Sequence, residues 1–164
     1  MENNNTFDLK AALRSMKVVH FALVNGLFFF LIVDLLLLYS GGVMLDDKEF
    51  AKNLLYALLV LSAAGLWFGG YIFKKKINSG LPEKKNLEEK LLLYREAMIM
   101  RTASWEVPAF AGCVFFMMTG GITFAVIAVF FMVVMVLARP TAAGIVRDLG
   151  LEGEEARQLL PDRH

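Results

Sequence analysis

A few polar and ionisable side chains stand inside or at the edge of long apolar runs, where such groups are uncommon. Glu106 lies in RTASWEVPAF and Asp34 lies in LFFFLIVDLLLLYSGG. A charge in a hydrocarbon layer costs on the order of 3 kcal/mol or more, so such residues usually face protein or water and mark pairing, ion or proton sites. The candidate intramembrane polar or ion site comprises Glu106, Asp34, Asn25 and His20.

Glu106 has two possible roles. It follows Arg101 by about one and a half helical turns, roughly 7 Å at 1.5 Å per residue, which places it at or just beneath a headgroup boundary. In a structural role it would pair with Lys17, His20 or Asn25 and hold two helical hairpins together. In a functional role the desolvated carboxyl would bind a proton or a cation.

The other three candidates also leave alternatives open. Asp34 is either a neutral or snorkelling carboxyl near an outer interface or part of an ion site. His20 is close to Lys17 and is expected to be a solvated ring rather than a ligand. Asn25-Gly26 is expected to serve helix packing through an interhelical hydrogen bond.

Three residues of the same run are assigned to packing and to the interface. Arg101 is expected to contact Trp105, four residues on, or a lipid phosphate, and Trp105 reads as a residue of an aromatic belt. Pro108 cannot donate a hydrogen bond to the carbonyl of Ser104, so it loosens the helix there.

Small residues are concentrated in the second apolar run. Gly65, Gly69 and Gly70 form a face that would let a neighbouring helix approach closely, although a channel wall could use the same face. Close packing is the preferred interpretation.

The composition excludes several classes of function. Cys113 is the single cysteine, and no CxxC, HExxH or Cys/His cluster occurs, so we expect no disulfide, no metal site and no cofactor. A net charge of +1 gives no signal for nucleic-acid binding. Because no nucleophile and base set or phosphate loop is present, we do not expect an enzyme.

The elements that must position these residues are helices. The chain has 164 residues, of which 57% are hydrophobic and concentrated in a few runs, and a helix needs roughly 20 apolar residues to cross a bilayer. The sequence predicts an all-α integral membrane protein with four transmembrane helices in two hairpins. The spans are expected at about 18–39, 54–73, 102–119 and 122–138.

Lysine and arginine collect before the first run, between the second and third, and after the fourth. This pattern places both termini and the middle segment in the cytoplasm of a bacterium with the chain in its inner membrane. The transmembrane domain is expected at 1–139, with a cytoplasmic helical segment at 86–101 and a cytoplasmic tail at 140–164.

The cytoplasmic segments carry helix signals of their own. Asn86 and Glu89 have the spacing of a capping box, and the amphipathic helix that follows would be covered by its own tail or by a partner. In the tail, Thr141 can cap a short helix, Gly150 can end it, and a second helix can begin near Gly153. This tail could fold back on the basic segments or extend into solvent.

The two hairpins can be aligned as a tandem repeat. An offset of 81 residues aligns His20 with Arg101 and Asn25 with Glu106. True repeats would be related by an axis along the membrane normal and would make Asn25 and Glu106 neighbours.

Two resemblances follow from these motifs. The A-x-x-E-x-P-A pattern of Ala103 to Ala109 resembles the carboxylate helix of proteolipid c subunits of rotary ATPases. Here, however, Glu106 begins the first helix of a hairpin and the glycine repeat is missing, so a working c subunit is not expected. RTASWEVPAF and VLARPT…RDLGL are similar to segments of small, uncharacterised bacterial inner-membrane proteins with four helices. That resemblance implies the fold and no particular activity.

The expected function is that of a non-catalytic scaffold or accessory subunit, a helical bundle in the lipid bilayer that forms a homo-oligomer or joins a larger membrane complex. The alternative is a small transporter or an ion- or proton-conducting subunit that uses Glu106 and Asp34.

Overall fold

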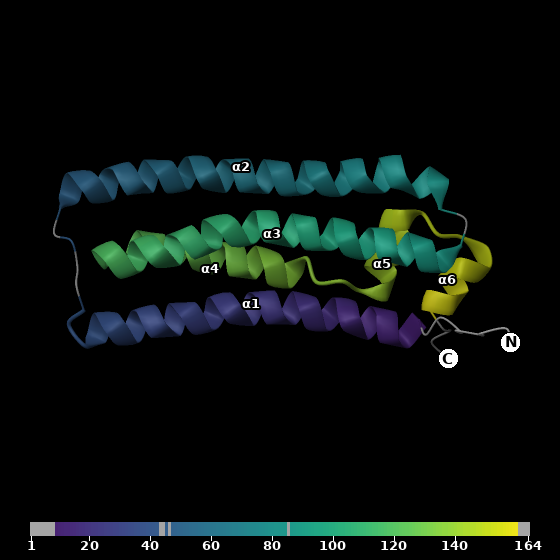
Figure 1. Cartoon of the computed structure of the whole chain (residues 1–164), viewed down its shortest axis with the longest axis horizontal. Coiled ribbons are helices and arrows are strands. Elements are labelled where there is room, and N and C mark those ends of the chain that lie inside the picture. Colours follow the sequence, from purple (N-terminus) through teal and green to yellow (C-terminus); the bar gives the residue numbers. More distant parts are fainter. Residues whose placement is uncertain (1–8, 43–44, 46, 85, 161–164) are drawn as a thin grey trace, which may run out of the picture.

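The computed structural model describes residues 9–42, 45, 47–84 and 86–160, and within these ranges every regular element is a helix (Figure 1). The all-α prediction is therefore confirmed. In chain order the elements are α1 (Leu9–Tyr39), α2 (Lys48–Gly80), the short 3-10 helix η1 (Leu81–Glu83), α3 (Leu87–Thr119), α4 (Ile122–Leu137), α5 (Ala142–Leu149) and α6 (Gly153–Leu159).

Helix α3 is the centre of the bundle. It packs against α2, α4 and α1, whereas α1 and α2 lie on opposite sides of it and scarcely touch (Figure 1). The contact between α3 and α4 is tight, because a Cβ atom on Gly112 would lie only 3.0 Å from the carbonyl oxygen of Phe124. The two helices of the first hairpin, α1 and α2, are therefore apart, whereas those of the second, α3 and α4, are in contact. This packing does not have the symmetry expected of two equivalent repeats.

Two helices, α1 and α2, are long and apolar enough to cross a membrane, and α4 joined with α5 would be a third across a bend of 81°. α1 and α2 are longer than the predicted spans 18–39 and 54–73 and begin earlier. α3 is not among these candidates. Ser104, Trp105 and Glu106 lower the mean hydropathy of its apolar half.

Helix ends follow the predicted capping residues closely. The side chain of Asn86 accepts a hydrogen bond from the Glu89 amide at 2.9 Å, and that of Thr141 accepts one from the Gly144 amide at 3.1 Å. Gly150 ends α5 with a φ of 60°, in the left-handed region that favours glycine. Gly120 does the same for α3 with a φ of 66°, which closes the turn to α4.

Residues 138–160, after α4, fold back onto the bundle and do not extend into solvent. Ile145 and Leu149 of α5 are buried in one apolar cluster with Leu91 and Tyr94 of α3. Lys90 of α3 forms an ion pair with Glu155 of α6 at 2.7 Å. We call this region the capped end; it comprises the last turns of α2, the first half of α3, α5 and α6. The amphipathic start of α3 is thus covered by the protein's own tail.

Beyond the capped end, the four long helices form what we call the apolar layer: α1 from Val18, α2 up to Phe73, α3 beyond Arg101, and α4. Its interior is filled by residues such as Leu27, Leu58, Phe116 and Phe131, each no more than 2% exposed. Its outer surface is also apolar. Large exposed side chains on it include Phe21, Phe29, Leu36, Val60, Trp67, Val126 and Phe130.

Candidate functional site

At the C-terminal end of α4, two polar side chains from neighbouring helices contact the last carbonyl groups of the helix. Pro140 has no amide hydrogen, so α4 stops just before it and its last carbonyl groups need other donors. His20 of α1 places Nε2 2.8 Å from the carbonyl oxygen of Met135. Arg101 of α3 donates from a guanidinium nitrogen to the carbonyl oxygen of Ala138 at 3.3 Å. Two neighbouring helices therefore cap the third.

The histidine ring is part of the interior. His20 is 5% exposed, and its Nδ1 has no partner among the described residues. The expectation of a solvated ring was wrong. The reason is the carbonyl of Met135 in the last turn of α4, which lies 115 positions along the chain and which the sequence around His20 does not reveal.

The guanidinium of Arg101 also contacts two aromatic rings. Its Cζ atom lies 4.2 Å from the ring centroid of Phe73 on α2 and 5.3 Å from that of Trp105. Such cation–π contacts contribute about 0.5–2 kcal/mol each, more where water is excluded. The predicted contact with Trp105 is confirmed. Arg101 joins α2, α3 and α4 at one point.

Trp105 lies between helices and not on the outer surface. It is 9% exposed, and a Cβ atom on Gly69 of α2 would lie 2.7 Å from its Nε1. Its position between two helices differs from that of a belt residue exposed to lipid. Part of the predicted small-residue face is confirmed, because Gly65 and Gly69 both lie against α3. A Cβ atom on Gly70 would meet nothing within 4 Å, so this glycine does not belong to that contact.

Pro108 explains why α2 comes so close at Gly65. The proline is buried inside α3 and cannot donate to the carbonyl of Ser104, so that oxygen lacks its usual helical partner. A Cβ atom on Gly65 would lie 2.8 Å from this oxygen and 3.1 Å from Cγ of Pro108. Only glycine fits here, and its Cα–H group can face the free carbonyl as a weak donor.

Asp34 is the most isolated polar group of the layer. It is 1% exposed, and neither carboxyl oxygen has a hydrogen-bond partner among the described residues. Cys113 of α3, itself fully buried, is its electrostatic neighbour. A buried polar group without a partner typically costs 1–3 kcal/mol.

Glu106 and Asn25 do not form the predicted clasp. Asn25 donates its side-chain amide to the carbonyl oxygen of Phe21 in its own helix at 3.0 Å, and a Cβ atom on Gly26 beside it would meet nothing within 4 Å. Glu106 is partly exposed and makes no hydrogen bond or ion pair within the described ranges. The predicted packing role of Asn25-Gly26 was therefore also wrong.

The four predicted site residues are consequently not one site. His20 and Asp34 lie about 21 Å apart along α1, at 1.5 Å per residue. Asn25 serves its own helix, and Glu106 is separate from both. The structure brings together His20, Arg101 and Trp105 instead, around the end of α4.

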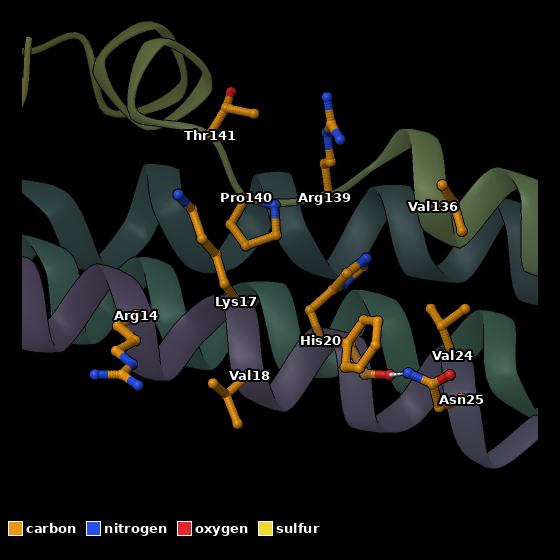
Figure 2. A pocket seen from close by; sticks show the side chains of 11 residues that line it. Arg14, Lys17, Val18, His20, Val24, Asn25, Val136, Arg139, Pro140 and Thr141 are labelled. Atoms are coloured by element: carbon orange, nitrogen blue, oxygen red, sulfur yellow. Dashed lines mark hydrogen bonds between the residues drawn. The ribbon is translucent and has the colours of Figure 1, made fainter.

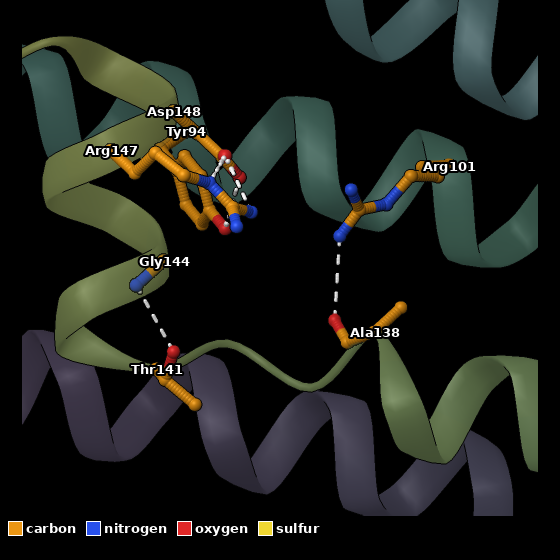
Figure 3. A network of polar contacts seen from close by, with 7 residues as sticks. All are labelled: Tyr94, Arg101, Ala138, Thr141, Gly144, Arg147 and Asp148. Carbon is orange, nitrogen blue, oxygen red and sulfur yellow. Dashed lines mark hydrogen bonds and ion pairs between the residues drawn. The ribbon is translucent and has the colours of Figure 1, made fainter.

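Two cavities flank the segment 138–141, and sequence reasoning identified neither. One of about 560 Å³ lies toward α5 and includes Tyr94, Arg101, Arg147 and Asp148 in its wall (Figure 3). Its one acidic residue, Asp148, pairs with Arg147 at 3.0 Å, and Arg101 and Arg139 also line it. Burial and the nearby Asp148 carboxylate raise the pKa of Tyr94 above its ordinary value of 10.0.

The other cavity, of about 700 Å³, lies between α1 and the segment that follows α4 (Figure 2). Arg14, Lys17 and Arg139 provide positive charge, and Phe21 and Val136 contribute apolar wall. We call it the α1–α4 cavity. The signal in the sequence was the basic residue at the boundary of each helix, Lys17 before one apolar run and Arg139 after another.

The polar groups around α4 can cap a helix, fix helices at one height and attract an anion, and they offer little for bond-breaking chemistry. No group of three or more His, Cys, Asp or Glu residues that could hold a metal ion occurs within the searched, described residues. Comparison with protein families, with curated proteins and with solved structures found no match to this chain.

Proposed function

We propose that the chain is an integral membrane protein whose four long helices cross a bacterial inner membrane, with both termini in the cytoplasm. The exposed apolar side chains of α1, α2 and α4 support this, because a surface of this kind matches lipid. The basic residues Lys74 and Lys75 at the capped end support the orientation, since positive charge collects on the cytoplasmic side.

Within that setting we assign the chain a non-catalytic role, as a scaffold or accessory subunit that assembles with itself or with a larger membrane complex. The observation that carries this is how the polar groups are used. His20 and Arg101 cap α4, and the remaining candidates do not converge on a common pathway.

The outer face of α2 is the surface best suited to assembly. Because α2 packs chiefly on α3, most of its circumference faces outward. Val60 is 71% exposed and Trp67 is 68% exposed, and the Trp67 ring stacks on that of Tyr71 with centroids 5.3 Å apart. Aromatic residues are enriched where membrane and protein partners meet.

Cross-linking in native membranes tests assembly through this face. Cys113→Ala gives a cysteine-free background, into which Val60→Cys or the buried control Leu58→Cys is introduced. A bifunctional maleimide is expected to give a discrete larger product for Val60→Cys and none for Leu58→Cys. A monomer alone from both variants, with no partner copurifying, would contradict the scaffold role.

Topology is tested separately, with a reporter fused to each end and alkaline extraction of the membranes. The protein is expected to resist extraction, and both reporters should be active only in the cytoplasm. Release into the supernatant, or reporters on opposite sides, would overturn the membrane assignment.

A second function, ion or proton conduction, is favoured by the buried and unpartnered carboxyl of Asp34. Its test is the flux of protons or sodium ions into liposomes that contain the full chain. The conduction hypothesis predicts that Asp34→Asn abolishes flux while the protein remains folded. If the unaltered protein shows no flux, the conduction hypothesis is wrong and only the scaffold role remains.

A further inference from the structure

We infer that the α1–α4 cavity is a binding site for an anionic phospholipid, with the headgroup phosphate at Lys17 and the acyl chains along the apolar wall. This rests on the proposed insertion of the bundle into a membrane. It goes beyond a general affinity for lipid because it assigns one place on the surface and one charge class of ligand.

The first argument is uncompensated charge. Arg14, Lys17 and Arg139 line the cavity together, and the residues that line it include no acidic side chain. No ion pair involves any of the three within the described part of the chain. The neighbouring cavity toward α5 shares Arg139 but also contains a carboxylate, that of Asp148, which pairs with Arg147.

The second argument is the common height of the charges. The bond between His20 and the carbonyl of Met135 fixes α1 against α4. The two helices run in opposite directions, so Lys17 and Arg139 both lie about one helical turn from that bond, toward the capped end. Both also stand where an apolar run meets a polar segment, which is the level of phospholipid headgroups.

The third argument is the shape and chemistry of the wall. Figure 2 shows Lys17 extending from α1 toward Pro140 and Thr141, while the side chain of Arg139 lies above His20 in this view and points away from α1. Deeper in the layer the wall is apolar, and Phe21 and Val136 are 69% and 49% exposed. A positively charged rim above an apolar groove is complementary to a phosphate that carries acyl chains, and basic pockets of this kind between helices bind anionic headgroups.

The buried imidazole is a further sign that the cavity is built. His20 lines it at 5% exposure and leaves Nδ1 without a partner among the described residues. The end of α4 and the segment 138–141 are held in place by His20 and Arg101. The charges at the rim are therefore carried by fixed elements.

Native mass spectrometry of the full chain, released from detergent micelles, tests the inference with dioleoyl phosphatidylglycerol as the probe. The unaltered protein is expected to retain one phosphatidylglycerol in preference to dioleoyl phosphatidylcholine. Lys17→Gln should weaken phosphatidylglycerol binding about tenfold, as expected for the loss of one charge-assisted contact. Lys74→Gln is the matched control, because Lys74 belongs to the same end of the bundle but does not line the cavity.

Three results would overturn the inference: equal loss in the two variants, equal binding of phosphatidylcholine, or displacement by glycerol 3-phosphate, which would indicate a site for free phosphate. Equal melting temperatures of the two variants in lipid-free detergent exclude misfolding as the cause. Alkaline extraction of membranes that contain the protein distinguishes failure of the lipid site from failure of the proposed membrane insertion. A chain that resists extraction but binds lipid unselectively disproves only the site, and a chain that is extracted disproves insertion.

Discussion

The capped end and the apolar layer are held together by different means. In the capped end, buried side chains such as Ile145 pack on α3, and charged groups such as Lys90 and Glu155 are paired. In the apolar layer, the oxygens of Asp34 and the indole nitrogen of Trp105 lack partners among the described residues, and the outer surface is as apolar as the interior.

The difference follows from the solvent that each region is suited to. Water drives apolar side chains inward, so a core such as that of the capped end stabilises itself. Lipid gives no such drive, and helices associate through close packing and a few polar contacts. The apolar layer shows both of these devices, in the glycine contact between α2 and α3 and in the polar caps at the end of α4.

A large effect is expected where backbones approach most closely. In Gly69→Leu the new Cβ atom would lie 2.7 Å from Trp105 Nε1, and the helices would have to separate. Overpacking of this kind typically costs about 1–3 kcal/mol and sometimes more. Thermal unfolding in detergent measures it. Gly70→Leu, which has open space, should leave the melting temperature unchanged, and equal effects at both glycines would show that packing is not what joins these helices.

A comparable loss is expected in the capped end, but confined to it. Ile145→Ala removes a fully buried side chain, which typically costs about 2–5 kcal/mol. Limited proteolysis should then release the tail, while unfolding of the long helices is little changed. Leu160→Ala, at a residue that is 43% exposed, is the control. Simultaneous loss of the long helices would mean that the two regions are one cooperative unit.

A smaller effect is expected from the cap on α4. His20→Ala leaves the carbonyl of Met135 with only its backbone donor, the amide of Ala138, so we expect the loss of one hydrogen bond, about 0.5–1.5 kcal/mol. Chemical denaturation in detergent measures the change. Asn25→Ala removes a hydrogen bond within a single helix and should cost much less. If the two substitutions lowered the free energy of unfolding equally, the bond between α1 and α4 would contribute nothing of its own.

The smallest effect is expected at a surface ion pair of the capped end. The hydrogen bond and charge of Lys76, 2.9 Å away, hold the pKa of Glu96 below its ordinary value of 4.5. A lowered folded-state pKa gives stability that is present above pH 4.5 and is lost as the pH falls through the lower value. Because the Glu96 side chain is 62% exposed, solvent screens the pair and the contribution is at most a few tenths of a kcal/mol. Comparing the melting temperature of Lys76→Gln with the unaltered protein between pH 3 and pH 7 checks it: the difference should shrink at low pH.

Local signals in the sequence predicted the helices and their ends well. Asn86, Thr141 and Gly150 act as caps as expected, because capping involves residues only a few positions apart. Gly65 and Gly69 were also recognisable, since small residues one turn apart leave a groove for a neighbouring helix.

The candidate site was predicted poorly for a physical reason. The ring of His20 forms its hydrogen bond with a backbone carbonyl on another helix. Every residue has a carbonyl, so this partner has no signature in the sequence. Glu106 does not pair with Asn25 or His20, because the side chains of both residues bond to backbone carbonyls instead. Which helices are neighbours, with α3 between α1 and α2, depends on packing that no single segment encodes.

In the membrane-spanning arrangement that we propose, the length of α4 has a consequence for the surrounding bilayer. Its 16 residues extend over about 24 Å, whereas a typical hydrocarbon core is about 30 Å thick. A short helix of this kind creates hydrophobic mismatch, which thins the membrane locally and favours bilayers with shorter acyl chains. The protein would therefore deform the leaflets on its α4 side and leave them closer to their resting thickness beside the longer α2.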